Sequence, residues 1–302
     1  RIILSIIICS YNRASYITGS LSSLYECNAN LEDFEVLFVD NNSTDNSLQI
    51  ANEWRAAHPL GNFTITAETK QGASYARNTG AKMAKGQWLC FMDDDAVAFP
   101  DFVQNILNHI TTYPDRVGFG GRIIPKYIPQ EPSWMSYYVS SMVGHFHYSE
   151  TYTAFKNGKY PLESNMIVRK DIYDKVGGFN EALPGVVGTV RIGGEGKALF
   201  YSMMELGYTI YYDPSIIVHH IVETKKLTAT YLYNVASGMG RGEKTRTLAI
   251  GSFSYFKKIV EYLMKLGAAI VLGLGYTIKG KPQQFWPIVK FRIDTLKGLI
   301  GL

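Results

Sequence analysis

Strand-like runs alternate with helix-forming segments through the first third of the chain. The runs cover residues 2–9, 34–39, 63–68 and 88–92, and the segments between them carry apolar residues at helical spacing. Strands that alternate with helices in this way are joined by right-handed crossovers and make a parallel sheet. The pattern therefore predicts an α/β fold in which helices flank a mixed, mainly parallel sheet.

Polar residues follow three of these predicted strands. Ser10, Tyr11 and Asn12 come after the first, Asp40 ends the second, and Asp93 ends the fourth. The carboxyl ends of parallel strands lie along one edge of a sheet, where open α/β sheets bind their ligands. We therefore expect these side chains to converge on one ligand.

Asp93 begins a run of three carboxylates that continues through Asp94 and Asp95. Adjacent carboxylates repel one another, so a divalent cation would stabilise them, and oxygen ligands suit Mg²⁺ or Mn²⁺. A bound cation of this kind suits a phosphorylated substrate. A solvated acidic turn is the alternative for a bare triplet, so the neighbouring motifs must decide between the two.

Length and cysteine usage limit the class of protein. The 302 residues, 46% of them hydrophobic and 19% charged, can form one large α/β domain with additions or two domains. Cys9 and Cys90 lie in predicted strands and Cys27 lies near the end of a predicted helix, so we expect buried thiols in the cytoplasm. No cleavage pattern follows residues 2–9, which we expect to be a core strand rather than a signal peptide.

The middle of the chain is less regular. Residues 125–160 are rich in Pro, Tyr, Trp and His without a clear period, which predicts a long loop of the kind that carries specificity. Trp134 in this loop could stack on a sugar or could belong to the core of the region. Strand and helix patterns return at residues 165–176, and strands are predicted at residues 208–213 and 216–218.

The C-terminal residues 253–302 form a basic, apolar tail with a helical pattern. They hold eight lysines and arginines against two acids, whereas the preceding 252 residues hold 22 bases and 24 acids. The most apolar stretch, residues 266–278, is shorter than the ~20 residues that span a bilayer. This predicts a helix in the headgroup region of a membrane, with an extra helical layer or a dimer contact as the alternatives. The tail lacks interleaved aromatic and basic residues, so we expect no nucleic-acid binding.

Eight ordered motifs between about residues 3 and 222 together resemble family 2 glycosyltransferases. They are SIIICSYNR (5–13), VDNNSTD (39–45), GASYARNTG (72–80), the Asp triplet, SNMIVR (164–169), GGFNE (177–181), GGE (193–195) and His220 after Pro214. The family is inverting, has the Rossmann-like GT-A fold and uses nucleotide-diphospho-sugars. The resemblance implies a GT-A domain at residues 1–222, with a nucleotide-sugar half (1–124) and an acceptor half (125–222), followed by a helical extension (223–302).

The resemblance also implies a set of donor-binding residues. Tyr11 would lie against the nucleobase, and Asp40 would accept hydrogen bonds from it. Arg77 and Asn78 would face the nucleotide pocket. The remaining donor-binding residues would be Ser10, Asn12, Arg13, Asp93 and Asp94.

For the metal, the resemblance implies that Asp95 holds Mn²⁺ or Mg²⁺ on the diphosphate, while Asp93 contacts the ribose and also reaches the metal. His220 matches a histidine that completes this site in some members. His219 and His220 are neighbours in a predicted strand, so one ring should point toward the site and the other away. A core or surface histidine is the alternative.

The catalytic base is where the sequence departs from the family. Inverting transfer needs a carboxylate that takes the proton from the acceptor hydroxyl. Many members place an Asp where this chain has Gly196, so we expect the preceding Glu195 to serve as the base. Glu163 and Glu181 are the alternatives, and a weakened enzyme is another.

The acceptor side is expected to include Asn165, Glu163, Trp134 and Arg241. Arg241 lies in a basic segment that family members often place near a diphosphate or the phosphates of a lipid-linked acceptor. An ordinary solvated turn is an equally good interpretation of this segment.

Taken together, the resemblance implies a metal-dependent inverting transferase that moves a sugar from a donor, UDP-linked by family frequency, to a glycan or lipid-linked glycan in cell-surface polysaccharide synthesis. We expect it in the cytoplasm, peripheral on the inner face of the cell membrane. One alternative is an inactive member that binds nucleotide-sugar or a partner protein. A nucleotidyltransferase is the other, but it would normally carry a Gly-rich basic loop where this chain has residues 10–13.

Overall fold

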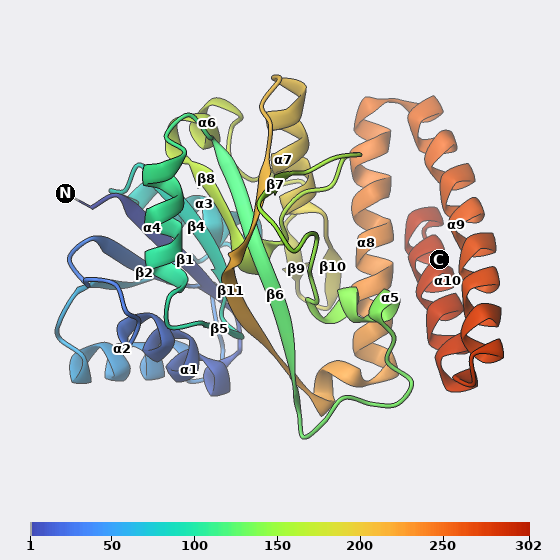
Figure 1. Cartoon of the computed structure of the whole chain (residues 1–302), viewed down its shortest axis with the longest axis horizontal. Helices are drawn as coiled ribbons and strands as arrows, with labels where there is room; N and C mark the ends of the chain where they lie inside the picture. The colour runs from blue at the N-terminus through green and yellow to red at the C-terminus, as the bar shows by residue number, and fades with distance from the viewer. Residues whose placement is uncertain (1) are drawn as a thin grey trace. The chain divides into compact units, whose positions relative to one another are not determined.

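A computed structural model of the chain describes residues 2–302 (Figure 1). The chain forms two compact units, each assembled from several segments. The first comprises residues up to 124, 146–181 and 196–220, and the second comprises residues 125–145, 182–195 and 221–302.

The first unit is built on a mixed sheet whose early strands are parallel. Its strand order is β3-β2-β1-β4-β8-β6-β11-β5, and β7 pairs with β11. Strands β1, β2, β3 and β4 run parallel to one another, whereas β8 is antiparallel to both β4 and β6. The strands are β1 (Leu4–Ser10), β2 (Phe34–Asp40), β3 (Asn62–Ala67), β4 (Trp88–Asp93), β5 (Ala96–Ala98), β6 (Gly118–Ile128), β7 (Thr153–Ala154), β8 (Met166–Arg169) and β11 (Tyr211–Glu223). The predicted α/β class is confirmed.

Two hydrophobic clusters cover the two faces of this sheet. Side chains alternate along β1, so Ile6 and Ile8 belong to one cluster and Ile7 to the other. Helices α1 (Ala14–Tyr25), α2 (Ser47–Ala57) and α4 (Phe102–Thr112) contribute to the first cluster, and α3 (Ala73–Met83), α6 (Lys170–Lys175) and α7 (Glu195–Glu205) to the second. Gly80 lets α3 approach β1 closely, because a Cβ there would lie 2.5 Å from Ile7 Cγ2.

The strand β11 differs from its prediction. Residues 208–213 and 216–218 are predicted as two separate strands, but β11 begins at Tyr211 and continues through Asp213, Pro214 and Ser215. The Asp213 carboxylate lies 2.8 Å from the His109 ring of α4 and also accepts from the Ser215 hydroxyl. A buried partner on a distant helix therefore keeps this polar segment in the sheet.

The second unit is mainly helical. Its long helices are α8 (Ala229–Ile250), α9 (Ser252–Ile278) and α10 (Phe285–Ile300), and α10 packs on both of the others. The predicted C-terminal helical extension is confirmed. The unit also holds α5 (Tyr137–Ser140), the 3₁₀ turns η1 (Ser141–Val143), η3 (Thr224–Leu227) and η4 (Pro282–Gln284), and the hairpin of β9 (Gly185–Val187) and β10 (Val190–Ile192).

Glycines bring the backbones of α8 and α10 into direct contact. A Cβ at Gly240 would lie 2.0 Å from the Thr295 carbonyl oxygen, and one at Gly298 would lie 1.9 Å from the Ser237 carbonyl oxygen. Both distances are far inside van der Waals contact. These two positions therefore exclude any side chain while the helices keep this packing.

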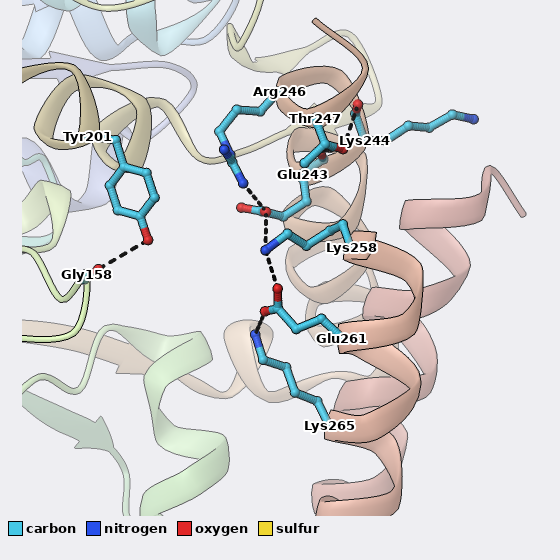
Figure 2. A network of polar contacts seen from close by, with 9 residues as sticks. All are labelled: Gly158, Tyr201, Glu243, Lys244, Arg246, Thr247, Lys258, Glu261 and Lys265. Carbon is cyan, nitrogen blue, oxygen red and sulfur yellow. Dashed lines mark hydrogen bonds and ion pairs between the residues drawn. The ribbon is translucent and has the colours of Figure 1, made fainter. Parts of the chain in front are cut away.

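An ion-pair chain links α8 to α9 (Figure 2). Glu243 lies 2.9 Å from Arg246 and 3.6 Å from Lys258, and Glu261 lies 2.5 Å from both Lys258 and Lys265. Figure 2 also draws a contact of the first unit, in which the Tyr201 hydroxyl donates to the Gly158 carbonyl at 3.3 Å. Lys258, Glu261 and Lys265 are thus paired along α9.

Helix α9 is longer than the apolar stretch that predicted it. It runs for 27 residues, and its most apolar window has a mean hydropathy of 1.5 with 17% of that window buried. Among residues 2–302 it is the helix long and apolar enough to cross a membrane by length and composition. The apolar stretch begins after Lys265, but Lys265 pairs with Glu261 and the helix continues back through both residues to Ser252.

Candidate functional site

The carboxyl ends of β1, β2 and β4 meet at one edge of the sheet. Ser10 is the register partner of Asp40, and Cys9 is the register partner of Asp93. The Ser10 hydroxyl donates to Asp94 Oδ2 at 2.7 Å, and its carbonyl accepts from the Asn41 amide at 2.7 Å. The structure therefore brings the polar strand ends together in the first unit.

Three side chains at this edge form a candidate metal centre. Asp93, Asp95 and His220 each offer one ligand atom, and these atoms lie within 4.8 Å of one another. His220 Nε2 lies 2.9 Å from Asp95 Oδ1, and both residues are buried. Two carboxylates and an imidazole form a donor set that suits Mn²⁺. His220 comes from β11, in the half of the sheet far from β1 in sequence.

The two histidines at residues 219 and 220 point to opposite sides of β11, as their positions in a strand predict. The His219 ring lies 4.7 Å from the Phe99 ring, and its Nδ1 lies 3.3 Å from the Ile124 carbonyl. Only His220 joins the candidate metal centre.

Two arginines face the carboxylates. Arg13 lies 3.5 Å from Asp95 Oδ2, and Arg77 lies 3.3 Å from Asp93 Oδ1. Burial, together with the neighbouring charge of Asp95, raises the pKa of the Asp94 carboxyl. The negative charge at this edge is therefore incompletely balanced by the arginines, which favours an additional cation.

Asp40 presents a buried acceptor beside the end of β1. Its side chain is 3% exposed, and its Oδ2 accepts from the Ser43 amide at 3.1 Å. Its Oδ1 is buried and has no hydrogen-bond partner among residues 2–302. A buried acceptor of this kind is costly to leave unpaired, so it suits an N–H donor of a ligand.

Asn12 holds two loops together. Its Oδ1 accepts from the Thr44 amide at 2.7 Å and from the Asp45 amide at 3.3 Å, and its Nδ2 donates to Thr44 Oγ1. Its backbone is left-handed, with φ of 52°. The structure thus uses this side chain to fix the loops after β1 and β2, and it leaves Tyr11 half-buried beside them.

Arg77 and Asn78 are neighbours on α3, but their side chains contact different parts of the first unit. Arg77 points to Asp93, whereas the Asn78 amide oxygen accepts from the Tyr173 hydroxyl at 2.6 Å and the Phe179 amide at 2.9 Å. A cavity of about 410 Å³ lies on the Asn78 side, lined by this residue, the loop 176–181 and part of α7. Asn78 therefore fixes the loop at residues 173–179, and its role toward a nucleotide stays a prediction.

Ser164 is a site residue for which the sequence analysis proposed no role. It lies in the 3₁₀ turn η2 (Glu163–Asn165), and its hydroxyl donates to Asp93 Oδ2. The next residue, Asn165, donates to the carbonyls of Arg122 and Ile216 at 3.1 and 2.9 Å and so joins β6 to β11. No periodicity in the sequence indicates either contact, because each partner is distant along the chain.

Two predicted acceptor residues lie in the second unit. Trp134 is half-buried against its hydrophobic cluster. Arg241 donates from Nε to the Arg191 carbonyl at 2.7 Å and from a terminal nitrogen to Ser237 Oγ at 3.1 Å. Both side chains contribute to packing within the unit, and their acceptor roles stay predictions.

Two of the three candidate bases lie at the start of α7, one as its first residue and the other through a contact from a distant part of the chain. Glu195 is its first residue and is 6% exposed. Glu163 Oε1 accepts from the Gly196 amide at 3.1 Å. Glu181, the third candidate, lies 3.6 Å from Lys70 at the surface.

Comparison with known proteins supplies the family. The model of glycosyl transferase family 2 matches residues 5–177. An uncharacterized glycosyltransferase of Haemophilus influenzae is 37% identical over 112 residues, which are 37% of this chain and 36% of the relative. The glucosyl-dolichyl phosphate glucuronosyltransferase of Haloferax volcanii is 23% identical, over 58% of this chain and 55% of the relative. The chain thus spans about a third and about half of these two relatives.

A third relative is covered more fully. It is the dolichyl N-acetyl-alpha-D-glucosaminyl phosphate 3-beta-D-2,3-diacetamido-2,3-dideoxy-beta-D-glucuronosyltransferase of Methanococcus voltae, 27% identical over 78% of this chain and 73% of its own length.

Solved structures share the fold. A mannosyltransferase from Pyrobaculum calidifontis in complex with GDP-Man and Mn²⁺ superposes with a TM-score of 0.67 at 17% identity, over 99% of this chain and 87% of that one. S. aureus TarS 1–349 in complex with UDP gives 0.55 at 17% identity, over 99% and 91% of the two chains. The chain therefore belongs to glycosyl transferase family 2 and has the GT-A fold.

Proposed function

We propose that the protein is a metal-dependent inverting glycosyltransferase that moves a sugar from a nucleotide-diphospho-sugar to a hydroxyl of a glycan or lipid-linked glycan, in the synthesis of cell-surface polysaccharide or glycolipid. The observation that carries the proposal is the convergence of Asp93, Asp95 and His220 beside the buried acceptor of Asp40. Two relatives are named for transfer to dolichyl phosphate-linked sugars, which supports a lipid-linked acceptor.

The residues of the site match the demands of this reaction. Asp93, Asp95 and His220 would hold Mn²⁺ or Mg²⁺, which neutralises the charge that develops on the leaving diphosphate. Arg13 and Arg77 orient the two carboxylates. A carboxylate takes the proton from the acceptor hydroxyl as it attacks the anomeric carbon, and a single displacement inverts that carbon.

Asp40 favours uracil as the donor base. One of its carboxylate oxygens already accepts from the Ser43 amide, which leaves Oδ1 for the ligand. Uracil offers a single ring N–H on its pairing edge, whereas guanine offers adjacent ring and amino donors that would use both oxygens. The remaining acceptor therefore fits a uridine diphosphate sugar best.

Thermal unfolding with a panel of ligands tests this proposal. The panel is UDP, UDP-glucose, UDP-N-acetylglucosamine, GDP and GDP-mannose, each with and without Mn²⁺. A ligand at 100 times its Kd stabilises the folded state by about 2.7 kcal/mol, so binding is easily detected. We expect a Mn²⁺-dependent increase in Tm with the uridine compounds.

The same panel separates the alternatives. An increase in Tm with the guanosine compounds alone would overturn the choice of uracil as the nucleobase. No change in Tm with any compound would overturn the donor site. A metal-dependent shift without any turnover of the sugar nucleotides would identify the chain as a binding protein of the family.

We also propose that helix α9 attaches the protein to the inner face of the cell membrane. The exposed residues of α9 form an apolar stripe, defined as Phe253, Phe256, Val260, Leu263, Met264, Ile270, Val271, Leu274 and Ile278. Lys257 flanks the stripe, and Lys279 and Lys281 follow its end, all three exposed. Apolar burial plus attraction of lysines to anionic lipid is the usual basis of interfacial binding. The thiols of Cys9, Cys27 and Cys90 are unpaired, which fits the cytoplasmic side.

The packing of α9 supports a surface position rather than a membrane span. Its Tyr262, Ala269 and Gly273 are buried within the second unit, and its Lys258 and Lys265 belong to the ion-pair chain with Glu261. A spanning helix would take these charges into hydrocarbon, which is expensive. A one-sided stripe instead needs only shallow insertion.

Vesicle sedimentation tests the attachment. Met264→Glu with Val271→Glu should weaken binding to phosphatidylglycerol-containing vesicles by at least about tenfold, because each lost apolar side chain removes about 1.5–3 kcal/mol of burial. Leu60→Glu, an equally exposed leucine in the first unit, is the control and should bind as wild type does. Unchanged binding by the double variant, or a stable dimer in the absence of vesicles, would reject the proposal.

A further inference from the structure

Position 196 lacks the side chain that the sequence motif leads one to expect. The motif at residues 193–195 is followed by Gly196, the second residue of α7, where many family members carry the aspartate base. An active enzyme with this sequence therefore needs its base carboxylate to come from elsewhere. The question is which acid occupies the corresponding space.

The carboxylate of Glu163 occupies that space. A Cβ built on Gly196 would lie 2.5 Å from Glu163 Oε1, 2.9 Å from its Cδ and 3.1 Å from its Cγ. Glu163 Oε1 also accepts from the Gly196 amide at 3.1 Å. The Glu163 carboxylate therefore fills the volume that a side chain at position 196 would take.

The backbone around Glu163 is tied directly to the candidate metal centre. Glu163 is the first residue of η2, and the hydroxyl of the next residue, Ser164, donates to the metal-ligand candidate Asp93. Asn165, the third residue of the turn, is fully buried and bonded to two strands of the sheet. The turn is thus fixed on both sides, which holds Glu163 in a defined position near the site.

We propose that Glu163 is the general base of the transfer, in place of the aspartate that position 196 lacks; this inference rests on the proposed function. The acceptor oxygen forms its bond to the anomeric carbon while its proton passes to the Glu163 carboxylate. The bond from that carbon to the diphosphate oxygen breaks, and its electron pair leaves with the diphosphate. Glu195 then has the structural role of a first-turn acid of α7.

Matched glutamine variants test the assignment. Glu163→Gln keeps an oxygen that can accept from the Gly196 amide but cannot take a proton, and Glu205→Gln, at an exposed acid at the far end of α7, is its control. The probe is the sugar nucleotide that gives the largest Mn²⁺-dependent Tm shift, with water as the acceptor. We expect Glu163→Gln to lower hydrolysis by about 10²- to 10⁴-fold, the usual contribution of a general base, and Glu205→Gln to leave it unchanged.

Azide provides a readout that a merely structural residue would not move. Azide is already anionic and needs no base, so sodium azide should restore turnover to Glu163→Ala by forming the glycosyl azide. It should not raise the turnover of Asp95→Asn, which retains its base and loses a metal ligand. Failure of azide to rescue Glu163→Ala while that variant still binds the nucleotide with Mn²⁺ would contradict the assignment.

The geometry also predicts that a carboxylate at position 196 can replace that of Glu163. Glu163→Ala removes the atoms that a Cβ at position 196 would meet, so adding Gly196→Asp should recover hydrolysis at least tenfold over Glu163→Ala alone.

Nucleotide binding separates this inference from the proposed function. Absence of Mn²⁺-dependent nucleotide binding by the wild-type chain would refute the donor site itself. Intact binding with no turnover in the wild-type chain would refute a working base, and loss of turnover in Glu195→Gln but not in Glu163→Gln would assign the base to Glu195.

Discussion

Asp95→Asn should abolish the Mn²⁺-dependent part of nucleotide binding and lower turnover of the sugar nucleotide by about a thousandfold. Asp95 is 6% exposed, and its two carboxylate oxygens face His220 and Arg13. The amide that replaces it has no charge and offers one oxygen, so the candidate metal centre would lose an anionic ligand. Thermal shifts measured with UDP, with and without Mn²⁺, and a hydrolysis assay provide the test.

The control for this change is Asp33→Asn, an exposed aspartate before β2 that lies outside the site. It removes the same charge from the chain and should leave both the metal dependence and the turnover unchanged. The Asp95→Asn protein must also unfold cooperatively, so that lost binding reflects the site and not the fold. A variant at Asp95 that retains a full Mn²⁺ response would show that the metal is held elsewhere.

Gly298→Ala should destabilise the second unit by about 3 kcal/mol or more. The new methyl group would lie 1.9 Å from the Ser237 carbonyl oxygen, and neither atom can move unless α8 and α10 separate. Overpacking in a core typically costs about 1–3 kcal/mol, and contact with backbone leaves less room for adjustment than contact with a side chain. Urea unfolding followed by far-UV circular dichroism would measure the loss.

The matched control is Gly267→Ala in the neighbouring helix α9. A Cβ at that position meets nothing within 4 Å, so only helix propensity changes, and the variant should gain up to about 1 kcal/mol. The same substitution in two adjacent helices is thus expected to lower the free energy of unfolding at Gly298 and to raise it at Gly267. A Gly298→Ala protein within about 0.5 kcal/mol of wild type would show that the helices do not pack through this contact.

Local patterns predicted the sheet well because its first strands follow one another in the chain. The apolar runs that became β1, β2 and β4 each end in a polar residue, and their parallel pairing brings those residues to one edge. The alternation along a strand likewise separated His219 from His220 before any contact was known. These features depend on a periodicity that is visible in a single sequence.

Other features depend on partners that only the fold brings together. Nothing local indicates that Asp213 would remain in a strand, because its partner His109 lies on α4. The same holds for the Ser164 hydroxyl on Asp93 and for the Glu163 carboxylate beside Gly196. A missing side chain in a motif can be read from the sequence, but its replacement can be identified only in three dimensions.

The interleaving of the two units has a consequence for the synthesis of the protein. Strand β11, which carries His220, lies between β6 and β5 in the sheet, although β5 is made more than a hundred residues earlier. The edge strand β5 and the candidate metal centre must therefore wait until residue 220 has left the ribosome, and the first 124 residues cannot complete either one alone. A shortened chain that ends before β11 would thus keep the aspartates of the centre without the histidine that joins them.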